Sequence, residues 1–403
     1  MQRSMLFLAT LGVAFTLPAQ APFVVHEWGT FTSIQGSDGV TLLGAHHEEE
    51  LLPAFVHEIS PLAAAAVRVK GIGAPMLGVT QKMETPVLYF HGGQARKVTV
   101  EVGFTKGLIS QWFPGVAAQA PVLGGLGGKP FDLRKIDTSM LRWECEILPR
   151  AQGVPSGLPR VRPDEPWSFA REVAADYVRA QGETEQYLFY RGVGRFELPV
   201  HVEAMRLGAG TLHNRGSLAI PAVIALEVAA DGARFRQLPA VAPGKAGGFD
   251  LGVVPKRPVP VVQQELQACV QALLVAQGLH ADEARAMVRT WARSWFHKRG
   301  TRVFYVVPRE ETDRLLPLVI TPRPDAVVRV LVGRIDYLTP EAEASLLQAV
   351  ADIDSGEEGR VAAGNRVLGE FDRFAEAALH RAHALTDSVR MRARIERMLT
   401  DLP

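Results

Sequence analysis

Apolar and polar residues alternate along many stretches of the first 240 residues, with the period of two that is typical of half-buried β-strands. The alternation is clearest just after residue 22, where Val25, Glu27 and Phe31 fall on one face and His26 and Trp28 on the other. β-Branched and aromatic residues dominate this run, as they do in strands. We therefore expect a strand that carries an imidazole on one face and a carboxylate on the other.

Two further pairs of alternating runs predict β-hairpins. The first joins residues 85–90 to residues 97–104 through a turn that contains His91 and two glycines. The second joins residues 219–229 to residues 234–238 through an Asp-Gly pair, which favours a tight hairpin turn. Strands of this kind, each with one apolar face, predict a sandwich-like antiparallel region.

The pattern changes after residue 260, where apolar residues recur with a helical period. We expect helices over residues 261–277, 282–298 and 366–385, and strands over residues 301–307, 316–320 and 326–335. Residues 241–260 are rich in proline and glycine, which is typical of a domain linker. The sequence therefore predicts an α+β fold, with a β-rich domain over residues 22–240 and an α+β C-terminal domain over residues 261–403.

The N-terminus has the three parts of a secretory signal peptide. Arg3 supplies the positive charge, Met5–Leu17 the apolar stretch, and Leu17–Ala21 the small residues of a cleavage site. We expect residues 1–21 to be removed, which gives a periplasmic or secreted protein. No later apolar run reaches the ~20 residues that a membrane-spanning helix needs, so we expect no transmembrane segment after signal removal.

The composition is that of an ordinary globular protein, with 47% hydrophobic residues, 22% charged residues and a net charge of +1. A chain with so little net charge has no overall field that attracts nucleic acid, and we expect no such partner. Export would permit a disulfide between the two cysteines, Cys145 and Cys269. Each lies on the apolar face of its predicted strand or helix, so both also fit as small core residues.

Two short segments carry a resemblance to other proteins. Residues His26–Ser33 (HEWGTFTS) and Lys82–Phe90 (KMETPVLYF) resemble an uncharacterised group of exported bacterial proteins. That group has no assigned activity. The resemblance therefore implies export and assigns no catalytic residue.

Five of the eleven histidines lie within the first 91 residues and are the candidate metal ligands: His26, His46, His47, His57 and His91. Imidazole is a common ligand of zinc and similar divalent cations, and carboxylates accompany several of these histidines. His26 is also the candidate catalytic base, with Glu27 as an acid/base or as a partner of His26. The simpler interpretation is that backbone hydrogen bonds satisfy His26 and Glu27, while the other histidines are solvated.

Two groups of polar residues share a helical face in the predicted C-terminal region. Arg285, Arg289 and Arg293 follow a spacing of four, and this stripe would suit a carboxylate, phosphate or sulfate. Glu376 shares a face with the histidines at positions 380 and 383, an arrangement that could hold a metal or carry protons. For both groups the simpler interpretation is a solvated face.

Several common motifs of exported enzymes do not occur in the sequence, namely His-Glu-x-x-His, Gly-x-Ser-x-Gly and Cys-x-x-Cys. Two interpretations of function stay open. In the first, the His and Glu residues form a metal-binding or acid/base site that hydrolyses an extracytoplasmic substrate. In the second, the chain is a non-catalytic envelope or secreted module, whose edge strands and exposed tryptophans, Trp112 and Trp167, bind a glycan or a protein.

Overall fold

The computed structural model of the chain describes residues 21–47, 52–59, 76–123 and 131–401. Nearly all of the expected signal peptide, and the acidic part of the run at residues 46–50, lie outside these residues. The described chain has several antiparallel sheets, and its helices are concentrated in the C-terminal half. The predicted α+β fold with a β-rich N-terminal region is therefore confirmed.

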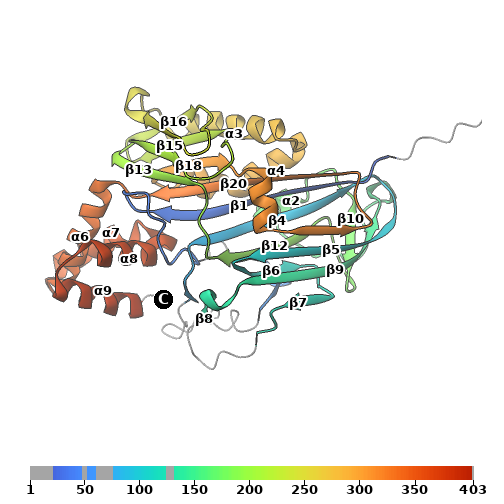
Figure 1. Cartoon of the computed structure of the whole chain (residues 1–403), viewed down its shortest axis with the longest axis horizontal. Helices are drawn as coiled ribbons and strands as arrows, with labels where there is room; N and C mark the ends of the chain where they lie inside the picture. Colours follow the sequence, from blue (N-terminus) through green and yellow to red (C-terminus); the bar gives the residue numbers. More distant parts are fainter. Residues whose placement is uncertain (1–20, 48–51, 60–75, 124–130, 402–403) are drawn as a thin grey trace, which may run out of the picture.

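A mixed sheet of nine strands forms the middle of the molecule (Figure 1). The order across the sheet is β16, β15, β18, β20, β1, β4, β12, β6 and β2. The strands are β1 Val24–Gln35, β2 His57–Glu58, β4 Gln81–His91, β6 Gly107–Phe113, β12 Leu188–Gly194, β15 Val223–Ala229, β16 Gly232–Leu238, β18 Gly300–Val306 and β20 Ala326–Tyr337. Because β1 runs parallel to β20 and antiparallel to β4, the first and last described strands lie side by side.

A second sheet of six strands packs against one face of the first. Its order is β11, β10, β9, β5 and β19, with β7 beside β9 and every pair antiparallel. These strands are β5 Arg96–Thr105, β7 Ala118–Ala120, β9 Thr138–Leu148, β10 Tyr177–Ala180, β11 Glu183–Glu185 and β19 Leu318–Thr321. Two small sheets consist of β13 Val200–Arg206, β14 Ala209–Asn214 and β17 Ala246–Asp250, and of β3 Met76–Leu77 and β8 Phe131–Asp132.

Helices cover the other face of the large sheet and one end of the molecule (Figure 1). Helices α2, α3 and α4 pack on the sheet, whereas α6, α7, α8 and α9 gather at one end. The helices are α2 Pro166–Ala170, α3 Val259–Ala276, α4 Ala281–Ala292, α5 Arg309–Leu315, α6 Pro340–Asp354, α7 Glu358–Gly369, α8 Ala375–Leu385 and α9 Val389–Asp401, with short helices η1 Leu133–Lys135, η2 Arg150–Gln152, η3 Leu251–Val253, η4 Arg293–His297 and η5 Asp372–Phe374. The helix expected over residues 366–385 is therefore divided between α7 and α8.

Two hydrophobic cores lie on the two faces of the nine-stranded sheet. Val25 of β1 and Trp143 of β9 belong to the core between the two sheets. Trp28 of β1 and Leu266 of α3 belong to the core between the large sheet and the helices. Each large apolar side chain buried in this way contributes roughly 1.5–3 kcal/mol to folding. The alternation predicted for β1 is confirmed, because successive side chains of this strand enter opposite cores.

The connection between β4 and β5 differs from the predicted hairpin. Strand β4 pairs with β1 and β12 in the large sheet, whereas β5 pairs with β9 and β19 in the second sheet. Gly92 and Gly93 have φ angles of 138° and 65°, which a residue with a side chain rarely adopts, and they let the chain pass from one sheet to the other. The predicted pairing is therefore wrong, although both strands exist.

The second predicted hairpin is confirmed. Strands β15 and β16 pair antiparallel from Val223 opposite Leu238 to Ala229 opposite Gly232. The two turn residues are Ala230 and Asp231, and Gly232, whose φ angle of 136° is rare for a residue with a side chain, begins β16.

The predicted linker at residues 241–260 contains β17 and η3 and leads into α3. Strands from both sides of this segment belong to the nine-stranded sheet, because β15 pairs with β18 and β1 pairs with β20. The large sheet thus contains strands from both predicted domains.

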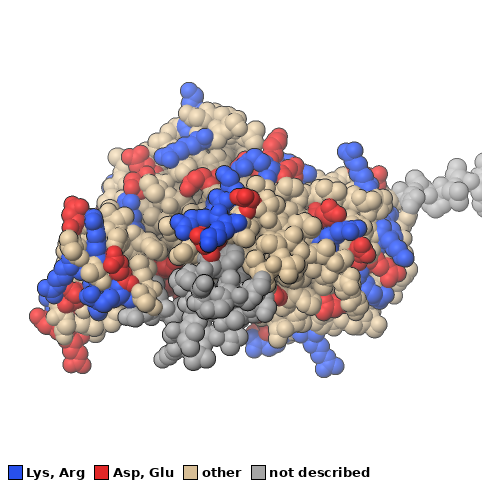
Figure 2. All heavy atoms as spheres, turned by 60° about the horizontal axis from the view of Figure 1, so that its bottom comes forward, with Lys and Arg blue, Asp and Glu red and all other residues tan. Residues whose placement is uncertain are grey.

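Charges of both signs lie on the face that Figure 2 draws, and both cysteines of the chain are free thiols. Among the described helices, none has the length and apolar character needed to cross a membrane. The two cysteines are free thiols, with Cys145 buried in β9 and Cys269 half-buried in α3.

Candidate metal centre

His26 lies near the start of β1, on the face of the large sheet that the helices cover. Trp28, two residues further along, enters the core beneath α3 and α4, and residues two apart on a strand share a face. His26 is only 3% exposed. A buried imidazole requires hydrogen-bond partners, which must come from the neighbouring strands or from the helical layer.

Strand β4 places a second imidazole beside the first. The antiparallel register sets His26 opposite Tyr89 and His91 opposite Val24. His91 is thus diagonal to His26 on the same face, a position from which long side chains can meet. The two ring centroids are 5.0 Å apart.

The first turn of α4 brings a carboxylate and a third imidazole. Gly278, with a φ angle of 105°, follows α3 and turns the chain toward α4. His280 is the N-cap residue of α4, and Glu283 lies three positions later. The Glu283 carboxylate accepts a hydrogen bond from the backbone N–H of His280 at 2.8 Å, as in a capping box. This contact directs the carboxylate back toward the strands.

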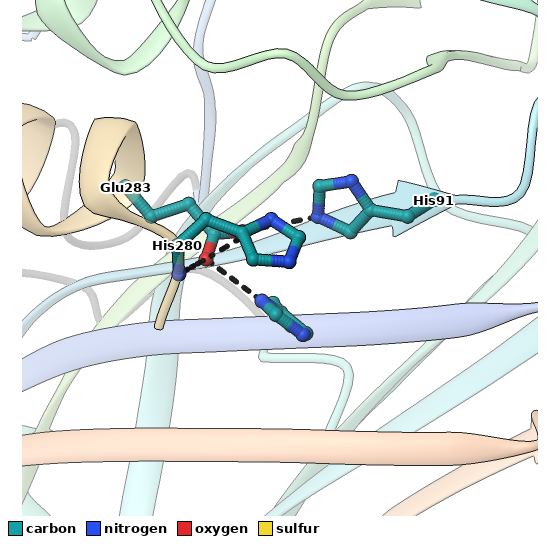
Figure 3. A group of neighbouring side chains, drawn as sticks. His91, His280 and Glu283 are labelled. Atoms are coloured by element: carbon teal, nitrogen blue, oxygen red, sulfur yellow. Dashed lines mark hydrogen bonds and ion pairs between the residues drawn. The ribbon is translucent and has the colours of Figure 1, made fainter. Parts of the chain in front are cut away.

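Glu283 joins the histidines into one cluster, of which three members are labelled in Figure 3. Its Oε2 lies 2.7 Å from Nδ1 of His26, and its Oε1 lies 3.0 Å from Nε2 of His91. The Nδ1 atom of His280 is more distant, at 3.9 Å from Oε2. One ligand atom from each residue can be chosen so that all four lie within 4.8 Å of one another. We call these four residues the histidine–Glu283 cluster.

The charge of Glu283 is strongly stabilised. Burial by itself would raise the pKa of this carboxyl, but the hydrogen bonds from His26 and His91 outweigh burial and lower the pKa to about 2. The pKa of His280 is lowered, chiefly by burial and further by the proximity of His26 and His91. The cluster therefore holds an ionised carboxylate beside an imidazole that resists protonation. Both properties favour metal binding, because metal ligands must be deprotonated.

The spacing of the donor atoms fits a small divalent cation. Metal–ligand bonds of ~2.1 Å at right angles would put neighbouring ligand atoms ~3 Å apart, and tetrahedral angles would put them ~3.4 Å apart. The contacts of 2.7 and 3.0 Å from Glu283 to His26 and His91 are close to these values. His280 is 53% exposed, so its ring has room either to coordinate a cation beside Glu283 or to remain outside the coordination sphere. Because an ionised carboxylate can only accept hydrogen bonds, the His26 and His91 nitrogens that face Glu283 would each donate a proton to it when no cation is bound.

A second cluster forms where α8 meets the segment after β1. Glu376 Oε2 lies 2.8 Å from Nε2 of His47 and 3.6 Å from Nε2 of His46, and the two stacked rings are 4.3 Å apart. His380 adds a nitrogen 3.7 Å from Oε1 of Glu376. Burial opposes ionisation of Glu376, but the hydrogen bonds from His380 and His47 lower its pKa to about 2. His383 pairs instead with Glu396.

The remaining candidate residues lie elsewhere. His57 is half-exposed on the edge strand β2 and bonds Glu183 at 2.7 Å. Glu27 points to the sheet-to-sheet core, where its carboxylate lies 2.5 Å from Nε of Arg329 and accepts a hydrogen bond from the Tyr190 hydroxyl. The structure does not bring Glu27 to His26, because adjacent residues of a strand point to opposite faces.

The carboxylate that does meet His26 was missed in the sequence. His280 and Glu283 have the spacing of a capping box, but the first position of such a box is usually serine, threonine, aspartate or asparagine. A histidine there gives no standard helix-start signal, and 257 positions separate Glu283 from His26. Only the packing of α4 on β1 and β4 reveals the group.

Comparison with known proteins adds no identification. The chain matches no family model, and no curated protein matches it.

Proposed function

We propose that this chain is an exported metal-binding protein that holds one divalent cation in the histidine–Glu283 cluster. One observation carries the proposal: three imidazoles and a buried carboxylate from β1, β4 and α4 meet within 4.8 Å. Nitrogen and carboxylate oxygen form a ligand set that zinc commonly takes, so zinc is the first ion to test. Among the described residues, this cluster has the most deeply buried ligands, with Glu283 at 0% and His26 at 3% exposed.

We further propose that the site hydrolyses an extracytoplasmic substrate. The cluster is buried on the sheet side and open on the side of His280, so a substrate would approach past this residue. A divalent cation bound there would lower the pKa of a water ligand to ~7, which supplies a nucleophile without an organic cofactor. Such chemistry suits the periplasmic or secreted location that we propose from the N-terminal sequence.

The alternative of a surface binding module has less support. Trp112 and Trp167 were expected to be exposed, but they are 5% and 6% exposed. Trp112 lies in β6 and Trp167 in α2, and both pack in the cores. They therefore form no aromatic platform for a glycan on the surface.

Elemental mass spectrometry of the mature protein, purified without a tag, tests metal binding. We expect about one metal per chain in the unmodified protein and almost none in His26→Ala or Glu283→Gln. Glu183→Gln is the matched control, because Glu183 makes a similar 2.7 Å contact to His57 outside the cluster. Glu376→Gln reports separately on the second cluster. An unmodified protein without metal, or a Glu283→Gln protein that keeps its metal, would contradict the proposal.

Hydrolysis is tested with p-nitrophenyl acetate and p-nitrophenyl phosphate as probes. We expect turnover of at least one probe that a chelator removes and added zinc restores, and that Glu283→Gln lacks. Bound metal without turnover of either probe would contradict the hydrolytic part and leave the metal-binding part standing.

A further inference from the structure

A cavity lies on the helix-covered face of the large sheet, further along β1 than the histidine–Glu283 cluster. This cavity of about 600 Å³ opens between α2, α4 and the strands β1, β4 and β12. Small-molecule sites in proteins commonly have volumes of ~300–1,000 Å³. Its wall on β1 begins at Trp28, two residues after His26, and its wall on α4 includes Thr290 and Trp291, beyond the first turn that holds Glu283. The cavity is thus a separate feature from the histidine–Glu283 cluster.

Aromatic rings form much of the cavity wall. They are contributed by Trp28, Trp167, Tyr187, Phe189 and Trp291. Trp167 lies 4.9 Å from Phe189 and 5.5 Å from Tyr187, measured between ring centroids, so the wall is a packed aromatic surface. These rings are almost completely buried, from 0% exposed for Trp28 to 6% for Trp167, so they shape an apolar wall against which a planar apolar group can pack.

Arginines lie at the mouth. Three of the four arginines that line the cavity are exposed, namely Arg162, Arg289 and Arg293. The fourth, Arg191, is buried, and Asp164 and Glu165 are the acidic residues of the lining. Arg162 is paired with Glu165 at 2.9 Å, and Arg289 is paired with Glu172 and stacks over a phenylalanine ring.

Arg293 differs from these neighbours, since it has no ion-pair or hydrogen-bond partner among the side chains that the structure describes. Its guanidinium is therefore available to a carboxylate or sulfonate, which it can bind through two parallel hydrogen bonds. Arg285, one turn before Arg289 on the same stripe, does not line the cavity.

The strands are distorted where they line the cavity. The register shifts between Trp28 and Thr30 in the β1–β4 pair and between Phe189 and Gly192 in the β4–β12 pair. Thr85, which lines the cavity, has a φ angle of 44°, a strained value for a residue with a branched side chain. Bulges and strained residues concentrate beside binding sites, where they redirect side chains.

The hydroxyl of Thr85 and the indole nitrogen of Trp291 are among the polar atoms of this wall that are buried without a hydrogen bond to any described residue. A buried polar group that lacks a partner costs ~1–3 kcal/mol. Neither atom is accessible to water, so a polar group of a ligand would reach one of them only if the wall shifted.

We propose that this cavity binds an aromatic organic anion, with its ring against the tryptophans and its acidic group at Arg293. The inference does not rest on the metal site, and it is tested with a chelator present. The shape of the wall selects the ring, while the charge at the mouth selects the anion.

The test compares two fluorescent probes on the mature protein. 1-Anilinonaphthalene-8-sulfonate carries a sulfonate, and N-phenyl-1-naphthylamine has the same ring system without it. We expect Arg293→Gln to weaken binding of the sulfonate probe roughly tenfold, as the loss of one charge-assisted hydrogen bond predicts, and to leave the neutral probe unchanged. Arg285→Gln is the matched control and should change neither affinity.

A second variant tests the location of binding. Ala170 lines the cavity and is buried, so Ala170→Phe should fill part of the space and weaken both probes together. Circular dichroism and the melting temperature establish that this variant is folded, and Ala170→Leu replaces it if it is not. Failure of the sulfonate probe to bind, equal effects of Arg285→Gln and Arg293→Gln, or a folded filled variant with unchanged affinity would each overturn the proposal.

Discussion

Nδ1 of His26 and Oε2 of Glu283 lie 2.7 Å apart, although 257 positions separate the two residues in the chain. One belongs to the first described strand and the other to the first turn of α4. Both side chains are almost completely buried. The contact therefore joins α4 to β1 and sets the position of the candidate metal ligands.

His280 should contribute less to metal affinity than His26 does. Its ring nitrogen is 3.9 Å from Glu283, and its side chain is half-exposed. We expect His280→Ala to weaken zinc binding about 10- to 100-fold, the range for groups that assist the principal ligands, whereas His26→Ala abolishes binding. Competition with a chromophoric chelator measures both affinities. Equal losses in the two variants would show that His280 is a principal ligand.

Acid should destabilise the metal-free protein through Glu283. Its pKa is about 2 in the folded chain, against 4.5 for an unperturbed glutamate. A folded pKa below the unfolded value means that the stabilisation is complete above pH ~4.5 and is lost as the pH falls toward 2, in total by about 3 kcal/mol. Urea unfolding between pH 2 and 6 measures the slope.

Glu283→Gln should flatten this acid slope. Glu376, whose pKa is also lowered to about 2, contributes in the same direction. The double variant Glu283→Gln and Glu376→Gln should therefore be the least sensitive to acid. An unchanged slope in Glu283→Gln would contradict the assignment.

Glu27 should contribute to stability and not to metal binding. Its carboxylate pairs with Arg329 in the core between the sheets, and Arg329 also donates to Asp313 at 2.7 Å. We expect Arg329→Met to lower the free energy of unfolding by about 3–5 kcal/mol, because it leaves a buried carboxylate unpaired.

Adding Glu27→Gln to Arg329→Met should restore part of that loss, since the unpaired charge is then removed as well. Urea unfolding measures the stability of both proteins, and elemental analysis should find their metal content unchanged. Loss of metal from either variant while it is folded would return Glu27 to the candidate site.

The cysteines should react as free thiols of unequal access. Burial raises the pKa of Cys145 to about 12 and raises that of the half-buried Cys269. Because the thiolate is the reactive form, we expect Ellman's reagent to leave Cys145 unmodified in the native protein and to modify Cys269 slowly. Both thiols should react in denaturant without prior reduction. Fewer than two reactive thiols there would indicate a disulfide.

Local pattern was sufficient wherever the structure depends on near neighbours in the chain. The period of two in β1 placed His26 with Trp28 and Glu27 on the opposite face, because side-chain direction in a strand depends only on sequence spacing. The Asp-Gly pair after Ala229 located the β15–β16 hairpin for the same reason, since a tight turn is a property of a few residues.

Those local patterns could not predict which distant strands and helices pair with one another. The period of β4 and β5 is the same whether they pair with each other or with other strands, so the predicted hairpin was wrong. The parallel pairing of β1 with β20 and the contact of α4 with β1 likewise arise from burial of complementary apolar faces far apart in the chain.

The sequence by itself thus determined the class of fold and which residues lie on each face of β1. It also identified His26 and His91 as candidate metal ligands. Only the tertiary structure decided that these two imidazoles meet and that Glu283, not Glu27, is their carboxylate. The physical reason is that a metal site requires donor atoms at fixed distances in space, and those distances are set by packing between layers, which no local periodicity encodes.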